Sequence, residues 1–210
     1  MQGYVQRLER RVQPAPVHVM QSSAFTIRAD LAAIRAVNLL LSGPAGGLMG
    51  ARRIGDEVGR PQLLTFDMGG TSTDVALIDG QVNLTSEGSI GPYPVAVPMV
   101  DMHTIGAGGG SIARLDEGGM LVVGPESAGA DPGPASYARG GRLPTVTDAN
   151  LVLGRLRPGA FLGGGMQLDM AAAQLAVGRL AAQMQLSRQQ AAQGIIDLAN
   201  EHMAQALRVI

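Results

Sequence analysis

The sequence predicts an α/β fold with a helical C-terminal segment, and three observations support this prediction. Two apolar runs, at 63–67 and 73–79, have the length and flanking turn residues of buried strands. Residues 91–144 are irregular and rich in Gly and Pro, which predicts short strands joined by loops. Beyond residue 165, apolar residues recur at helical spacing.

The composition excludes several classes of site. All sixteen basic residues are Arg, so a Walker-type phosphate loop, which needs Lys, is absent. Cysteine is also absent, which excludes disulfides, thiolate nucleophiles and zinc–thiolate centres and fits the cytoplasmic location that we expect. The net charge of −1 gives no basic footprint for nucleic acid. No apolar run reaches 18 residues, and the N-terminus lacks a signal-peptide core, so we expect no membrane partner.

The N-terminal part predicts alternating short elements. They are a helix over 1–12, a strand over 17–23, a helical or helix-then-strand segment over 29–41, and a helix from 42 to about 58. Ser42 is the expected N-cap of the last of these helices, with Pro44 in its first turn and Gly59 at its end. Asp79-Gly80 predicts a two-residue hairpin turn that leads into a strand at 81–87.

Three further helices are predicted towards the C-terminus. Thr147 or Asp148 is expected to cap a short helix over 148–156, and Asp169 to begin a longer one. Ser187 opens a capping box with Gln190, from which a final helix follows. The apolar faces predicted for the two long helices comprise Ala173, Val177, Leu180 and Met184, and then Ile195, Ala199, Met203 and Ala206.

The chain divides on these patterns into three segments. Residues 1–16 end a preceding helical segment, 17–165 form a central domain, and 166–210 form a helical C-terminal segment. The chain starts inside a helical pattern and is still apolar at Ile210 without a C-cap. We therefore expect it to be a fragment of a longer protein.

The tip between the two strands at 63–79 is the strongest candidate site. Gly69 and Gly70 allow backbone N–H groups to approach phosphate oxygens, and the hydroxyls of Thr71, Ser72 and Thr73 add donors. Asp67, at the strand end, can hold Mg²⁺ through water, and Asp74 can orient the loop or assist an attacking group. The alternative is a plain hairpin in which these side chains only satisfy the turn backbone.

Other residues have a functional and a structural interpretation. Ser42 to Gly47 can bind an anion at a helix N-terminus or pack the helix closely. Gly108, Gly109, Gly110 and Ser111 can approach nucleotide or substrate, or form a flexible turn. Asp101 and His103 lie two apart, on one face if their segment is a strand, where they can bind a metal or make a structural hydrogen bond. Asp131 can hold a proline-stiffened turn or face the site, and Asp148 can cap a helix or act as a catalytic acid.

Five stretches carry a family resemblance. They are LLSGPAGGLMGA (40–51), FDMGGTSTDVALI (66–78), IGAGGGSIA (105–113), GPESAGADPGPASY (124–137) and TVTDANLVLGRL (145–156). In this order they resemble the hydantoinase A and 5-oxoprolinase family, which also includes an acetone carboxylase subunit. The hairpin tip is similar to the phosphate loops of the actin, sugar kinase and heat-shock chaperone superfamily, whose fold is ribonuclease-H-like.

The resemblance implies part of a ribonuclease-H-like ATPase core that uses ATP and Mg²⁺ to open a cyclic amide. In that family ATP phosphorylates the amide oxygen, so that water can open the ring. It also implies a hydantoinase B-type subunit or domain and an oligomer. The family's earlier phosphate loop and later adenosine motif are missing here, and Ala24-Phe25 and Ala36 depart from its pattern. Three alternatives remain: a small-molecule kinase, an actin-like assembly ATPase, and a catalytically inactive fragment.

Overall fold

The computed structural model describes residues 1–90 and 93–210, which divide into two compact units. The first unit comprises residues 1–66 and 75–103, and the second comprises residues 67–74 and 104–210. Gly91 and Pro92, at the start of the predicted irregular region, lie outside the described residues. The three segments expected from the sequence, 1–16, 17–165 and 166–210, stay a prediction.

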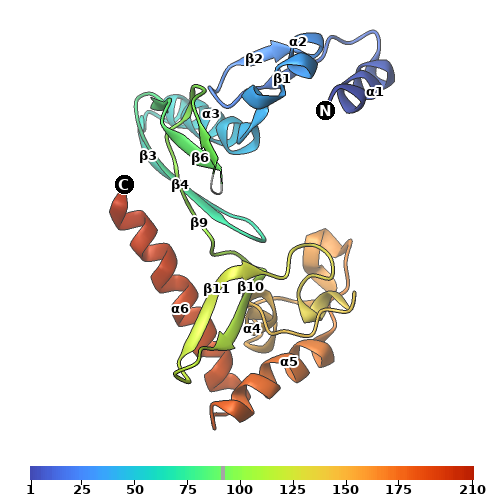
Figure 1. The fold of residues 1–210 in the computed structure, drawn as a ribbon, viewed down its shortest axis with the longest axis vertical. Helices are drawn as coiled ribbons and strands as arrows, with labels where there is room; N and C mark the ends of the chain where they lie inside the picture. The colour runs from blue at the N-terminus through green and yellow to red at the C-terminus, as the bar shows by residue number, and fades with distance from the viewer. Residues whose placement is uncertain (91–92) are drawn as a thin grey trace. The chain divides into compact units, whose positions relative to one another are not determined.

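The first unit is built from short strand pairs and helices (Figure 1). It contains α1 (Gln2–Val12), β1 (His18–Met20), β2 (Thr26–Arg28), α2 (Ala29–Ile34), η1 (Ala36–Leu39), α3 (Ser42–Glu57), β5 (Leu84–Thr85), β6 (Gly88–Ile90), β7 (Tyr93–Val95) and β8 (Met99–Val100). Three strands have residues in both units: β3 (Gln62–Met68), β4 (Thr73–Asp79) and β9 (His103–Ile105). Their order in the sheet is β3-β4-β9, while β1-β2, β5-β8 and β6-β7 form separate antiparallel pairs.

Helix α3 has the predicted length but a different start. Leu41, not Ser42, is its N-cap, and no side chain caps the helix. Leu41 adopts the left-handed conformation (φ 56°), which turns the chain directly into the helix, so Ser42 already lies in the first turn. The helix ends at Glu57, and Gly59 follows with a φ of +66°, as the C-terminal glycine signal predicted.

The core of the first unit joins α3 to the β3–β4 hairpin. Ala45 and Leu48 of α3 pack with Ala76 and Ile78 of β4 and with Val100 of β8, all of them buried. On β4 the buried residues alternate in part with exposed Leu77 and Asp79, because successive side chains point to opposite faces of a strand. Both predicted strands are present, as β3 and β4, but the prediction that 63–67 is buried is wrong: Leu64 and Phe66 are exposed, because the core of this unit packs on β4 and reaches only Leu63 of β3.

The hairpin predicted at Asp79-Gly80 is only partly formed. Gly80 has the positive φ (+73°) that such a turn needs, and Ile78 makes an isolated antiparallel bridge with Val82. Beyond that bridge, β5 leaves β4 and pairs with β8. The prediction of a continuous second hairpin strand is therefore wrong, because a partner distant in sequence takes the place of the neighbouring strand.

The second unit packs a β-hairpin against helices: β10 contacts α4, β11 contacts α6, and α5 packs against α4 and α6 (Figure 1). Its elements are β10 (Ser111–Leu115), β11 (Leu121–Ser127), η2 (Ala135–Tyr137), α4 (Val146–Val152), η3 (Pro158–Gly164), α5 (Met170–Gln183) and α6 (Arg188–Val209). Its main core gathers small and branched residues from β10, β11, α4, α5 and α6. None of the helices in the described ranges is long and apolar enough to span a membrane.

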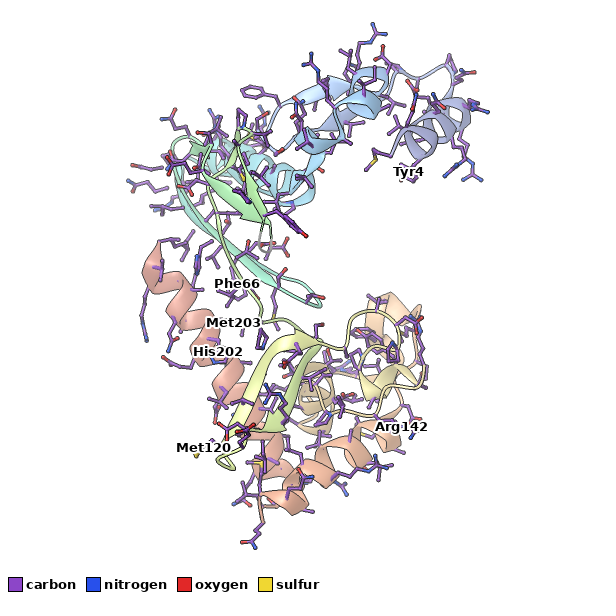
Figure 2. The ribbon with its side chains drawn as sticks, in the orientation of Figure 1. Tyr4, Phe66, Met120, Arg142, His202 and Met203 are labelled. Atoms are coloured by element: carbon purple, nitrogen blue, oxygen red, sulfur yellow. The ribbon has the colours of Figure 1, made fainter. Side chains whose placement is uncertain are left out.

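The helices of this unit follow their capping signals. Asp169 caps α5, and Ser187 and Gln190 form the predicted capping box of α6. The predicted faces of both helices are buried or half-buried in the core; Figure 2 labels Met203 of α6. The predicted cap of α4 is wrong: its N-cap is Thr145, and Asp148 is the acidic partner three residues on. A Thr-x-x-Asp box satisfies two backbone N–H groups reciprocally, which moves the helix start to Val146.

Candidate phosphate-binding site

The hairpin tip at residues 69–72 forms a tight turn. The N–H of Gly69 donates to the carbonyl of Ser72 at 2.8 Å and closes the turn. The next three N–H groups, of Gly70, Thr71 and Ser72, have no acceptor in the described part of the chain. A Cβ atom added at Gly70 would meet nothing within 4 Å. Successive N–H groups of this kind form the concave arrangement that binds anions such as phosphate.

A second glycine loop, Gly108 to Gly110, supports this tip from the same unit. The N–H groups of Gly109 and Gly110 donate to the carbonyls of Gly69 and Gly70, at 3.0 and 2.6 Å. The approach of the two loops requires glycine, because a Cβ at Gly108 would lie 2.8 Å from the Gly69 oxygen and the Thr71 nitrogen. The carbonyls of the tip are therefore held by neighbouring backbone.

The supporting loop is itself held by the elements around it. The N–H and the hydroxyl of Thr147, at the start of α4, both donate to the Gly109 carbonyl at 2.8 Å. The N–H of Ala128 donates to the Gly110 carbonyl at 2.9 Å, and the hydroxyl of Ser127 lies 3.3 Å from that of Thr71. The tip is thus connected through hydrogen bonds to β11 and α4, which makes it a preorganised loop.

Several residues predicted to contact the cofactor have structural partners here. The N–H of Gly108 donates to the hydroxyl of Ser111 at 2.9 Å, and the Ser111 N–H donates to the Gly108 carbonyl at 3.1 Å. Thr73 is fully buried, and its hydroxyl donates to the carbonyl of Ala107 at 2.6 Å. The described contacts of these residues position the tip, and their predicted contact with nucleotide stays a prediction.

The acidic residues at the strand ends differ in their surroundings. Asp67 is exposed, and no hydrogen bond or ion pair with a described residue engages its carboxylate. Asp74, at the start of β4, accepts a hydrogen bond from the Thr104 hydroxyl at 2.6 Å. Mg²⁺ keeps several waters and needs only one or two carboxylates, so a carboxylate that precedes the first of these tip N–H groups, that of Gly70, by three residues fits a magnesium–phosphate group.

The predicted metal pair and the other predicted sites stay open. Asp101 lies between β8 and β9, outside both strands, so the predicted shared strand face does not form; its N–H donates to the Asn83 carbonyl at 2.9 Å, and His103 is half-buried at the start of β9. Within the described ranges no group of three or more His, Asp or Glu gathers as a metal site. Asp131 is exposed. The roles predicted for Asp101, His103 and Asp131, and for the segment 42–47, stay predictions.

A buried carboxylate holds the loop that precedes α4. Asp148 is fully buried and accepts hydrogen bonds from the N–H groups of Ala135, Ser136 and Thr145, at 3.2, 2.8 and 3.0 Å. It also accepts one from the Thr145 hydroxyl at 2.8 Å. Burial, and then the negative charge of Asp148, raises the pKa of the neighbouring Tyr137. The sequence analysis singled out Asp148 as a capping residue, but the sequence carried no signal for its hydrogen bonds to residues 135 and 136.

Replacing Thr73 with valine is expected to cost about 1–2 kcal/mol of unfolding free energy. Valine has nearly the same shape, but it removes the buried hydroxyl and leaves the Ala107 carbonyl without this donor. Urea unfolding of the variant measures the loss. Thr65→Val is the matched control, because its hydroxyl also donates to a carbonyl, that of Ala76, from a half-buried position. An equal or smaller loss at Thr73 would contradict its supporting role.

Solved structures of two ATP-dependent enzymes resemble this chain along almost its whole length. The chain aligns with the nucleotide-free structure of an acetone carboxylase, an enzyme of ATP-dependent acetone carboxylation, at a TM-score of 0.85 and 33% identity; the match covers 97% of this chain and 29% of that one. It aligns with the ATP-dependent caprolactamase of Pseudomonas jessenii at a TM-score of 0.78 and 39% identity, over 98% and 31%. The chain thus has the α/β, ribonuclease-H-like fold of an ATPase core in partial form, with a helical C-terminal segment, as predicted.

The sequence matches identify the family. The model described as Hydantoinase/oxoprolinase matches residues 1–210, so the chain belongs to the hydantoinase/oxoprolinase family. It is 41% identical to the caprolactamase subunit alpha of P. jessenii, over 99% of this chain and 31% of that protein. It is 40% identical to a 5-oxoprolinase of Pestalotiopsis fici, over 98% and 17%. The chain therefore spans a third or less of the length of these relatives.

Proposed function

We propose that this chain is part of an enzyme that couples ATP hydrolysis to the opening of a cyclic amide. Two kinds of relative support the proposal: the ATP-dependent caprolactamase and the 5-oxoprolinases, whose names denote the opening of a lactam ring. The observation that carries the proposal is the run of N–H groups at Gly70, Thr71 and Ser72, which have no acceptor among the described residues and lie on a supported glycine tip.

In this proposal the residues of the tip bind phosphate. The three N–H groups and the Thr71 hydroxyl donate to phosphate oxygens, and Asp67 holds Mg²⁺ through water. Since the chain contains no Lys, the metal and the backbone dipoles must offset the phosphate charge. ATP supplies a phosphoryl group that activates the amide oxygen, so that the ring carbon becomes electrophilic. Asp74, fixed by Thr104, keeps the loop in position or assists the attacking water.

The proposal includes a partner. The names of two relatives, caprolactamase subunit alpha and acetophenone carboxylase gamma subunit from Aromatoleum aromaticum, denote subunits of larger enzymes. A hydantoinase B-type subunit or domain would complete the site here, together with the rest of the longer chain. An oligomer remains part of this proposal.

Phosphate release from ATP tests the function directly. The protein is co-expressed with its neighbouring subunit and supplied with hydantoins, 5-oxoproline, caprolactam and, separately, acetone with bicarbonate. Release that depends on one cyclic amide, with stoichiometric ring opening, is the expected result. A stable phosphorylated product would instead indicate a small-molecule kinase. Turnover indifferent to every compound, with nucleotide-dependent light scattering, would indicate an assembly ATPase.

Replacing Asp67 with alanine is expected to weaken Mg-ATP binding at least about tenfold, with little change in stability. The loss follows from the missing carboxylate, since a charge-assisted contact contributes about 1.5–3 kcal/mol. Stability is spared because Asp67 is exposed. Isothermal titration with Mg-ATP measures the affinity. Asp79→Ala is the control, because Asp79 is an exposed acid at the other end of the same hairpin. Equal binding by both variants would remove Asp67 from the site.

A further inference from the structure

A second candidate site lies in the second unit, between β10, the segment 142–144 and α5. It is a concave pocket of about 290 Å³. Its floor is apolar, with the buried side chains of Ala113, Ala176 and Leu180. The N–H of Ala113 donates to the Pro144 carbonyl at 2.8 Å, which fixes two of the three walls against each other. The pocket is therefore preformed in the folded unit.

The charged residues that line this pocket are all positive. Three of its ten lining residues are arginines, Arg114, Arg142 and Arg179, and none is acidic. Arg114 makes an ion pair with Glu126 on the neighbouring strand, with its Nε 3.4 Å from the carboxylate. In the described part of the chain, no carboxylate lies within 4 Å of the guanidinium groups of Arg142 and Arg179. Figure 2 labels Arg142, which belongs to an exposed segment of the unit.

We propose that this pocket binds a small oxyanion, a carboxylate or a phosphate, through Arg142 and Arg179. Guanidinium groups present a planar fork of donors that matches both carboxylate and phosphate oxygens. Like charges that line one depression repel each other, and a bound anion offsets this repulsion. A depression of this volume with an apolar floor suits a compact molecule with a short hydrocarbon body. Because Arg142 and Arg179 line the same depression, a dicarboxylate is the natural probe for this site.

The pocket lies outside the proposed phosphate tip. Its lining residues include none of residues 67–74 or 108–111. The pocket is connected to the tip through the chain: Pro144, which lines the pocket, precedes Thr145, the N-cap of α4, and the Thr147 hydroxyl donates to the Gly109 carbonyl. The inference nevertheless rests on the pocket alone and does not require that the tip binds nucleotide.

The test is a titration of glutarate, and separately of inorganic phosphate, into the purified protein at constant low ionic strength. Binding of at least one anion is expected, and Arg142→Gln and Arg179→Gln should each weaken it about tenfold. Arg157→Gln is the matched control, because Arg157 is an exposed arginine of the same unit that does not line the pocket. Glutaramide, the uncharged analogue of glutarate, should not bind.

Two results would overturn the proposal. One is the absence of binding of either anion at millimolar concentration; binding of an acidic peptide in their place would then assign the arginines to a protein interface. The other is anion binding that both pocket variants leave unchanged. The substituted residues Arg142, Arg179 and Arg157 are all exposed, so the melting temperature of each variant should match that of the wild type. This measurement separates loss of binding from loss of fold.

Discussion

Replacing Gly108 with alanine is expected to lower the affinity for Mg-ATP at least about tenfold and to destabilise the protein by about 1–3 kcal/mol. The new methyl group would lie 2.8 Å from three backbone atoms of the tip, in Gly69, Gly70 and Thr71. Backbone cannot rotate away as a side chain can, so the tip itself must move. Isothermal titration measures the affinity, and urea unfolding measures the stability.

Two other glycines serve as controls for this variant. Gly178→Ala lies inside α5, where the methyl group would make only an ordinary contact with Arg188 at 3.6 Å, and it should raise helix stability by up to about 1 kcal/mol. Gly70→Ala adds its methyl group in open space, so it should fold normally and affect only phosphate binding. Normal nucleotide affinity in Gly108→Ala would contradict the claim that the second glycine loop positions the tip.

Replacing Asp148 with asparagine is expected to cost about 3 kcal/mol of unfolding free energy, the largest stability effect that we predict. The carboxylate is fully buried and accepts four hydrogen bonds. An amide replaces one acceptor oxygen with a donor, which then faces backbone N–H groups of residues 135, 136 or 145. Urea unfolding, followed by circular dichroism, measures the change.

Asp116→Asn is the matched control for this substitution. The Asp116 carboxylate also accepts hydrogen bonds from two backbone N–H groups, those of Gly118 and Met120, both at 2.9 Å. Asp116, however, lies on an exposed turn. Water can replace those hydrogen bonds, so the cost should stay below about 1 kcal/mol. A loss at Asp148 no greater than that at Asp116 would contradict the role of Asp148 as the buried anchor of the loop before α4.

The sequence predicted the elements that local signals define. The helices α5 and α6 carry both a capping residue and an apolar face, and β3 and β4 are apolar runs on either side of a glycine turn. Each of these signals acts within a few residues of the chain, so it remains visible without tertiary information. The helix start at Thr145 was missed although it is local, because Thr145, Thr147 and Asp148 are all good capping residues and the sequence does not rank them.

The parts of the fold that the sequence did not predict depend on pairing between residues distant in the chain. The strand β5 pairs with β8, about fifteen residues further along, and nothing in either two-residue strand selects that partner. The same limit applies to the site. The tip at 69–72 was predicted from its own residues, but the sequence cannot distinguish a glycine loop that binds phosphate from one that supports another loop. The contacts of Gly108 to Gly110 with residues some forty positions earlier supply that distinction.

The claim that the N–H groups of Gly70, Thr71 and Ser72 bind phosphate can be tested by amide NMR. The protein is labelled with ¹⁵N at Gly, Thr and Ser and titrated with the magnesium complex of a non-hydrolysable ATP analogue. We expect these three amide resonances to shift downfield, with a midpoint equal to the calorimetric dissociation constant. If the nucleotide binds and these three resonances stay in place, the tip is not the phosphate site.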